Sequence, residues 1–236
     1  MDPLQEIKSQ INLSIQKKYT ELDYSECYVA FLDILGMKNL LDKNYSELRK
    51  LFNSIESIIA LYDQISIMGK EKILSQNQIR ITVMSDSIVL SMKKDIERSF
   101  SKIIGVSSAI INQVLISLSE PVFIRGGISA GKLSHTDFSV FGPGLVNSYL
   151  LEENQAIYMR CILSPQLYNE TEFKNYISTQ KAIVQDKKDG LYFIEFLRPE
   201  NKEVIKEFAK LQVESDKNND RIKEKYSWLL DRLEII

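Results

Sequence analysis

Two aspartates stand where strand residues are normally apolar. Asp33 lies near the end of the run CYVAFLDI, residues 27–34, and Asp86 separates two apolar runs, residues 79–84 and 88–92. Aspartate is depleted from strands, and a buried carboxylate is costly unless a cation or hydrogen bonds compensate for it. Two carboxylates at one point repel each other, and a divalent cation is the usual reason for both to stay ionised. The pair predicts a metal site if the fold joins the two residues; otherwise they are unrelated turn aspartates, which are common.

The elements around these aspartates decide whether they meet. β-Branched runs on both sides of Asp86, which is flanked by serines, predict a hairpin with Asp86 at its tip. Before the hairpin, apolar residues at three- and four-residue spacing from Leu48 to Tyr62 predict one face of a helix. After it, the pattern predicts a long helix over residues 96–118 and a glycine-closed strand over residues 122–131.

The rest of the chain completes an α+β order. A helix starting at Gly142-Pro143 is followed by three further strands and two charged helices, predicted over residues 157–163, 181–185, 191–197, 202–212 and 220–236. This order favours a ferredoxin-like sandwich, in which the first strand lies beside the hairpin and brings Asp33 to Asp86. We expect one domain over residues 26–198, an N-terminal helical extension over residues 1–25 and a C-terminal helical extension over residues 199–236.

Composition narrows the function further. The net charge of -2 and the pI of about 5.7 argue against a general nucleic-acid binder. No apolar run approaches the roughly 18 residues of a membrane span, and the first residues lack a signal-peptide pattern, so we expect a cytoplasmic protein with no membrane partner. Cys27 and Cys161 lie in apolar stretches, which fits reduced thiols. With two cysteines and one histidine, a metal would be a hard ion such as Mg²⁺ or Mn²⁺, held by carboxylates.

Four segments resemble the catalytic domain of class III nucleotide cyclases, in the correct order. They match its metal-binding strand, its second metal-binding hairpin, the next strand and the following helix, as FLDILGM, RITVMSDSIVLS, FIRGGISAGKL and FGPGLVNSYLLE. The serine-flanked aspartate, the Arg-Gly-Gly-Ile strand, the Phe-Gly-Pro helix start and the final Lys-Tyr-x-Trp-Leu are most similar to the pyrimidine nucleotide cyclases of bacterial Pycsar antiphage systems.

The resemblance implies a reaction and residues for it. Asp33 and Asp86, with the carbonyl of Ile34, would hold two divalent cations, and Arg125 would bind the β- or γ-phosphate. A break at Gly36 would let the Ile34 carbonyl turn toward a metal. Lys187, or its neighbour Lys188, is a second candidate phosphate ligand. The implied reaction converts UTP, or CTP, to the 3′,5′-cyclic nucleotide and pyrophosphate. The expected assembly is a homodimer with its sites at the interface, and a separate effector would sense the product.

The base-reading positions depart from the purine cyclases. The positions that hold charged residues in those enzymes hold Thr82 and Ser139 here. Short hydroxyls can pair with either edge of a pyrimidine, so these residues argue against ATP but do not choose between uracil and cytosine. Phe31 shares a strand face with Asp33 and is a candidate wall for the base; ordinary core packing is the alternative.

The transition-state residues depart as well. Val146 and Leu150 stand where purine cyclases carry an asparagine and an arginine, and Arg160 is the nearest basic substitute. Three alternatives stay open: a purine cyclase with an unusual pocket, an inactive cyclase-like module that binds nucleotide or dimerises, and a metal-dependent polymerase or nuclease of similar fold, such as a diguanylate cyclase. The diguanylate cyclase hairpin is absent, because Ser85-Asp86-Ser87 replaces its Gly-Gly-Asp/Glu-Glu-Phe motif.

Overall fold

The structure of the protein is a computed structural model. It describes residue 5 and residues 24–43, 45–68, 79–215 and 219–235. The predicted N-terminal helical extension, residues 1–25, therefore lies almost wholly outside the described residues.

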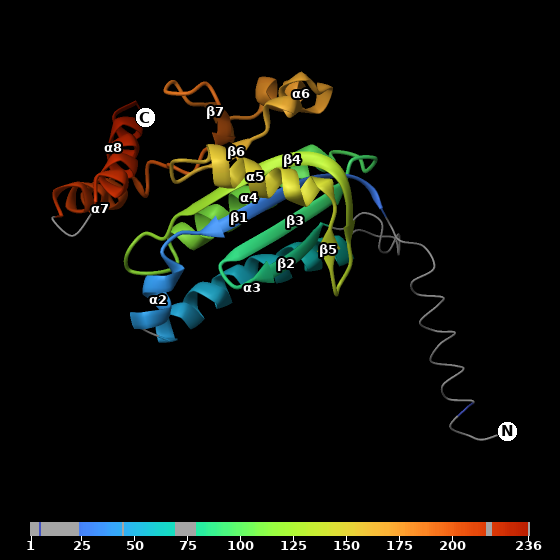
Figure 1. Ribbon diagram of the computed structural model, residues 1–236, viewed down its shortest axis with the longest axis horizontal. Coiled ribbons are helices and arrows are strands. Elements are labelled where there is room, and N and C mark those ends of the chain that lie inside the picture. The colour runs from blue at the N-terminus through green and yellow to red at the C-terminus, as the bar shows by residue number, and fades with distance from the viewer. Residues whose placement is uncertain (1–4, 6–23, 44, 69–78, 216–218, 236) are drawn as a thin grey trace.

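A mixed sheet forms the centre of the molecule (Figure 1). Its strand order is β2-β3-β1-β4-β6-β8-β7, with the short strand β5 paired to β4. All described pairings are antiparallel except the one between β4 and β6. The strands are β1 (Ser25–Ile34), β2 (Arg80–Met84), β3 (Ser87–Lys93), β4 (Ile124–His135), β5 (Val140–Phe141), β6 (Cys161–Leu163), β7 (Ile183–Gln185) and β8 (Tyr192–Ile194). The order β2-β3-β1-β4 is that of a ferredoxin-like sheet, which confirms the predicted fold class.

The two faces of β1 carry different side chains, because successive residues of a strand alternate between faces. Ala30, Leu32 and Ile34 are buried in the main core, together with residues of α3 (Tyr45–Met68) and α4 (Ser99–Leu115). The opposite face carries Phe31 and Asp33, and Figure 1 shows α5 (Pro143–Gln155) lying over this side of the sheet. One sheet face is thus packed for stability and the other is available for a site.

Helix α5 lies unusually close to β4. A side chain at Gly127 of β4 would clash with the carbonyl oxygen of Ser148, so only glycine permits this approach. A hydrogen bond between the hydroxyls of Ser129 on β4 and Ser148 on α5, 2.8 Å apart, also holds the helix to the strand. Close packing of this kind fixes the direction in which the last turn of α5 faces.

The C-terminal residues form two helices, α7 (Lys202–Glu214) and α8 (Asp220–Ile235), as the sequence predicts. Trp228 anchors α8, because its ring stacks on Tyr158 at 5.0 Å and its Nε1 donates a hydrogen bond of 2.8 Å to Asp186. The sequence pattern did not predict two short helices, α2 (Met37–Lys43) and α6 (Thr171–Thr179). Each helix has too few apolar residues to show a helical periodicity in the sequence.

Candidate active site at the end of the central strand

Strand β1 ends against the tip of the β2–β3 hairpin. Asp33 lies opposite Ser87 in the β1–β3 register, and the N–H of Ile34 donates a hydrogen bond of 2.8 Å to the carbonyl of Asp86. The hairpin turns within two residues, since Ser85 adopts a left-handed conformation with φ of 57°. The structure thus brings Asp33 and Asp86 together.

A cation and a third carboxylate join this pair. Arg125 lies opposite Asp33 in the β1–β4 register, and its Nη2 lies 3.6 Å from Asp33 Oδ2. The Nε of Arg125 forms an ion pair with buried Glu152, which comes from the last turns of α5. Sequence reasoning missed Glu152, since its position depends on how α5 docks on the sheet. The cluster consists of Asp33, Asp86, Arg125 and Glu152, and we call it the carboxylate cluster.

The electrostatics of the carboxylate cluster favour added positive charge. Burial raises the pKa of Asp33, Arg125 opposes this rise, and Asp86 adds to it. Burial also raises the pKa of Glu152; Arg125 lowers this pKa, and Asp33 raises it further. Divalent cations would remove this repulsion. Among the described residues, no three or more His, Cys, Asp or Glu side chains are grouped so that together they could hold a metal ion. Two carboxylates with open positions suit Mg²⁺ or Mn²⁺, whose remaining ligands are commonly water and substrate phosphates.

Phe31 and Thr82 lie on the same sheet face as Asp33. Cross-strand partners point to the same side, and Thr82 and Phe31 both lie opposite Val89. Phe31 packs edge-to-face on Tyr149 of α5, with ring centroids 5.5 Å apart. Phe31 therefore has a packing role in addition to any contact with a base.

A histidine that sequence reasoning missed lies beside Thr82. The Nε2 of His135 lies 2.8 Å from the Thr82 hydroxyl, and its Nδ1 lies 2.7 Å from the Ser91 hydroxyl. Burial lowers the pKa of His135 to about 4, so its ring is neutral at physiological pH. A neutral imidazole donates through one nitrogen and accepts through the other. Its tautomer therefore decides whether the Thr82 hydroxyl must donate to it or accept from it.

The other predicted nucleotide contacts lie apart from the carboxylate cluster. Ser139 is exposed in the turn between β4 and β5, and its backbone N–H donates to the Thr136 hydroxyl at 3.1 Å. Lys187 is exposed between β7 and β8, and the Nζ of Lys188 lies 3.4 Å from a Glu224 oxygen. Among the described residues, no hydrogen bond or ion pair links Lys187 or Lys188 to Asp33.

Arg160 has a structural environment. Its side chain is 0% exposed and forms ion pairs with Asp186 and Asp189. The guanidinium lies 5.2 Å from the ring centroid of Tyr158 and 5.5 Å from that of Trp228. With its charge paired and no exposed surface, this side chain is not available to a nucleotide in this conformation. The predicted transition-state role of Arg160 therefore finds no support in its geometry.

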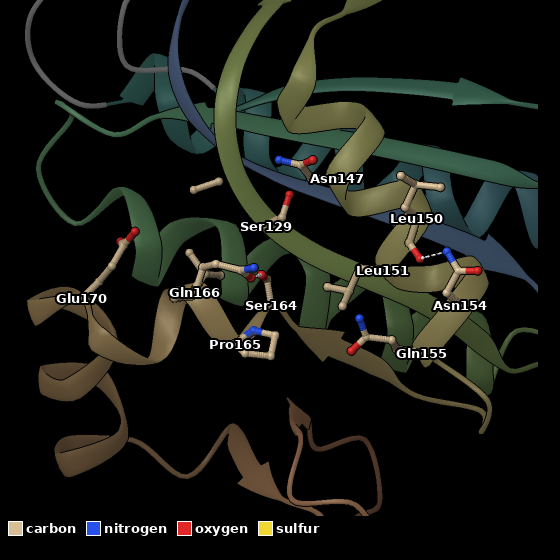
Figure 2. A pocket seen from close by; sticks show the side chains of 12 residues that line it. Ser129, Asn147, Leu150, Leu151, Asn154, Gln155, Ser164, Pro165, Gln166 and Glu170 are labelled. Atoms are coloured by element: carbon tan, nitrogen blue, oxygen red, sulfur yellow. Dashed lines mark hydrogen bonds between the residues drawn. The ribbon is translucent and has the colours of Figure 1, made fainter.

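Two cavities are formed by other residues, and no residue of the carboxylate cluster lines either of them. One, of about 370 Å³, lies between α5 and the 3₁₀ helix Pro165–Asn169 and has polar walls, including Asn147 and Gln166 (Figure 2). The second, of about 700 Å³, is lined by Leu35 and Gly36, directly after β1, and by Lys225 of α8. Of the residues that the sequence suggests for the reaction, the first cavity is lined only by Leu150.

The comparison with solved structures finds nucleotide cyclases. The adenylyl cyclase CyaB from P. aeruginosa is 15% identical and matches with a TM-score of 0.50, over 76% of this chain and 98% of that one. The catalytic core of a rhodopsin-guanylyl cyclase with converted specificity, solved with ATPαS, is 15% identical with a TM-score of 0.49, over 72% of this chain and 95% of that one. No protein-family model and no curated protein matches the sequence.

At sequence identities of 15%, the similarity to these structures concerns the fold alone.

No helix among the described residues is both long and apolar enough to cross a membrane. The described chain has the fold of a class III nucleotide cyclase catalytic domain.

Proposed function

We propose that this protein is a nucleotide cyclase that converts a pyrimidine nucleoside triphosphate, UTP in preference to CTP, to the 3′,5′-cyclic nucleotide and pyrophosphate. The observation that carries the proposal is the meeting of Asp33 and Asp86 at the end of β1, with Arg125 beside them. The sequence resemblance and the fold support the same reaction.

The residues of the chain would divide the work as follows. Asp33 and Asp86 would hold two Mn²⁺ or Mg²⁺ ions, with the Ile34 carbonyl as a further ligand. When bound, these ions supply activation of the ribose 3′-hydroxyl and neutralisation of the triphosphate. Arg125 would exchange its contact with Asp33 for the phosphates, and its guanidinium fork suits phosphate oxygens. Glu152 would hold the other side of that guanidinium and so orient it.

A pyrimidine base is favoured by the residues at the candidate base-reading positions. Thr82 and Ser139 offer hydroxyls and no charge, and Phe31 offers an aromatic wall. The neutral His135 ring would fix the direction of the Thr82 hydroxyl. UTP is preferred to CTP on the resemblance to the Pycsar branch alone.

A homodimer would complete the site. An exposed apolar surface, formed by Phe138, Phe141, Val146 and Leu150, extends from the β4–β5 turn along α5. A surface of this kind is typical of an interface, and it adjoins the open face on which Asp33 lies. A second copy docked there would bring its own Thr82 and Ser139 toward the metal site. The two sites would then be equivalent.

The cellular role follows from the resemblance. The cyclic product would act in the cytoplasm on a separate effector during antiphage defence. An inactive, cyclase-like binding module is the second candidate, favoured by Val146 and Leu150 at the places of the asparagine and arginine of purine cyclases.

The base preference can be tested directly. Purified protein with Mn²⁺ is offered equal amounts of ATP, GTP, CTP and UTP, and the cyclic products are separated by chromatography. We expect cyclic UMP to dominate, with cyclic CMP as a minor product. A dominant cyclic purine nucleotide would contradict the pyrimidine assignment, and no cyclic product would favour the inactive module.

A further inference from the structure

A lysine from the C-terminal helix lies within electrostatic range of the carboxylate cluster. Lys225 of α8 is half-buried and close enough to interact electrostatically with Asp33, Glu152 and Arg125. It also lines the 700 Å³ cavity, next to the residues that directly follow β1. Sequence reasoning noted Lys225 only as part of the final Lys-Tyr-x-Trp-Leu motif and gave it no role in the site.

The position of Lys225 is fixed by rigid packing. Trp228, Leu229 and Arg232 follow it at three-, four- and seven-residue spacing, which places all four on one face of α8, and these three are buried. Tyr226, the next residue, packs edge-to-face on Phe123 with centroids 6.3 Å apart. Lys225 is therefore a charged residue on the buried side of a helix that is held firmly against the core.

The ammonium of Lys225 lacks a close partner of its own. Within the part of the chain that the structure describes, it forms no hydrogen bond or ion pair, whereas Arg125 is engaged by Asp33 and Glu152. A half-buried, unpaired cation is costly, and an anionic ligand would offset that cost. Divalent ions bound by Asp33 and Asp86 would repel the ammonium, and the phosphates that accompany those ions would attract it.

We propose that Lys225 binds the triphosphate of the nucleotide, as a phosphate ligand contributed by the C-terminal helix. This inference rests on the proposed function and extends it. The helix α8 would thereby belong to the active site, and its docking would be required for tight substrate binding.

The test compares charge-removing and charge-keeping variants. Lys225→Met removes the charge but keeps the length and helix propensity, and Lys225→Arg keeps the charge. Lys223→Met is the matched control, because Lys223 lies on the same helix two residues away and therefore on a different face. Calorimetric titration with Mn²⁺ and inorganic tripolyphosphate measures binding without any chemistry, and the KM and kcat for UTP are measured in parallel.

We expect Lys225→Met to weaken tripolyphosphate binding by roughly 10- to 100-fold, as is typical for loss of a charge-assisted contact. The KM should rise more than kcat falls. Lys225→Arg should stay within about 3-fold of wild type, and Lys223→Met should bind like wild type. All four proteins should melt within a few degrees of one another.

Two results would overturn the inference: wild-type protein that does not bind tripolyphosphate, or Lys225→Met protein that binds it as tightly as wild type. A parallel loss of melting temperature that Lys225→Arg does not rescue would also overturn it, because Lys225 would then only hold α8 in place. Binding through Lys225 without any cyclic product would instead refute the proposed function and leave the phosphate site standing.

Discussion

At the scale of single residues, the open face of the sheet combines charged and neutral groups with separate tasks. In the carboxylate cluster, Asp86 adds to the rise in the pKa of Asp33, whereas burial between two hydroxyls keeps His135 neutral. The chain holds a single histidine, so this group can be observed without ambiguity.

The titration of His135 is the first prediction. Its pKa in the folded protein is about 4, below the ordinary value of 6.5. Between pH 4 and pH 6.5 the unfolded chain therefore binds the proton more readily than the folded protein does. The stability from neutral His135 should be fully present above pH 6.5 and fall by on the order of 3 kcal/mol as the pH drops toward 4. NMR of the one imidazole gives the pKa directly. Unfolding of wild type against His135→Gln should show the stability difference shrinking with acid.

An imidazole that titrates near its ordinary value, with a constant stability difference between the two proteins, would contradict the buried Thr82–His135–Ser91 arrangement.

At the scale of elements, local patterns predicted the strand and hairpin but not what docks on them. The apolar runs around Asp33 and Asp86 have strand periodicity, and the ferredoxin-like order then joins the two residues without further information. Glu152 and Lys225 reach the same place through the docking of α5 and α8. That docking depends on contacts such as Gly127 against Ser148, which no local pattern encodes. For Arg160 the local pattern was misleading. It is a basic residue next to a strand, but its side chain is buried and paired with aspartates.

The Arg160 ion pairs tie the residue before β6 to the β7–β8 turn, and their loss is the second prediction. Arg160→Met should lower the free energy of unfolding by about 3 kcal/mol, because it leaves buried Asp186 without its cation. Urea denaturation measures this change. Arg98→Met is the control, since the Arg98 side chain is 79% exposed and should matter by less than about 0.5 kcal/mol.

The same Arg160→Met variant separates structure from catalysis. The kcat of its folded fraction should stay close to that of wild type. A kcat that falls by orders of magnitude without loss of stability would return Arg160 to the catalytic role that the sequence alone predicted.

At the scale of the whole molecule, the open sheet face and the apolar surface beside it point to assembly. Asp33 lies on the sheet face over which α5 passes (Figure 1), and the β4–β5 turn and α5 carry exposed apolar side chains. The proposed second copy would cover these apolar groups and exclude water from the site.

A single charge in that surface is the third prediction. Leu150→Glu should convert a dimer to monomers at micromolar concentration and lower cyclase activity by at least about 10-fold, because each glutamate would be buried without a partner. Analytical ultracentrifugation measures the assembly. Leu211→Glu on α7, where the wild-type leucine is 64% exposed, is the matched control and should remain a dimer. Wild-type protein that sediments as a monomer up to about 100 μM, or a Leu150→Glu dimer, would rule out this interface.

The central claim is that Asp33 and Asp86 support cyclisation, and phosphorus NMR of UTP incubated with Mn²⁺-activated protein tests it most directly. After Mn²⁺ is removed from the quenched reaction, wild type should yield cyclic UMP and pyrophosphate in equal amounts. Asp33→Asn should reduce both by on the order of 100-fold or more, since it removes a metal ligand while keeping the side-chain shape. Orthophosphate in place of pyrophosphate, no turnover by wild type, or undiminished cyclic UMP from Asp33→Asn would contradict the account.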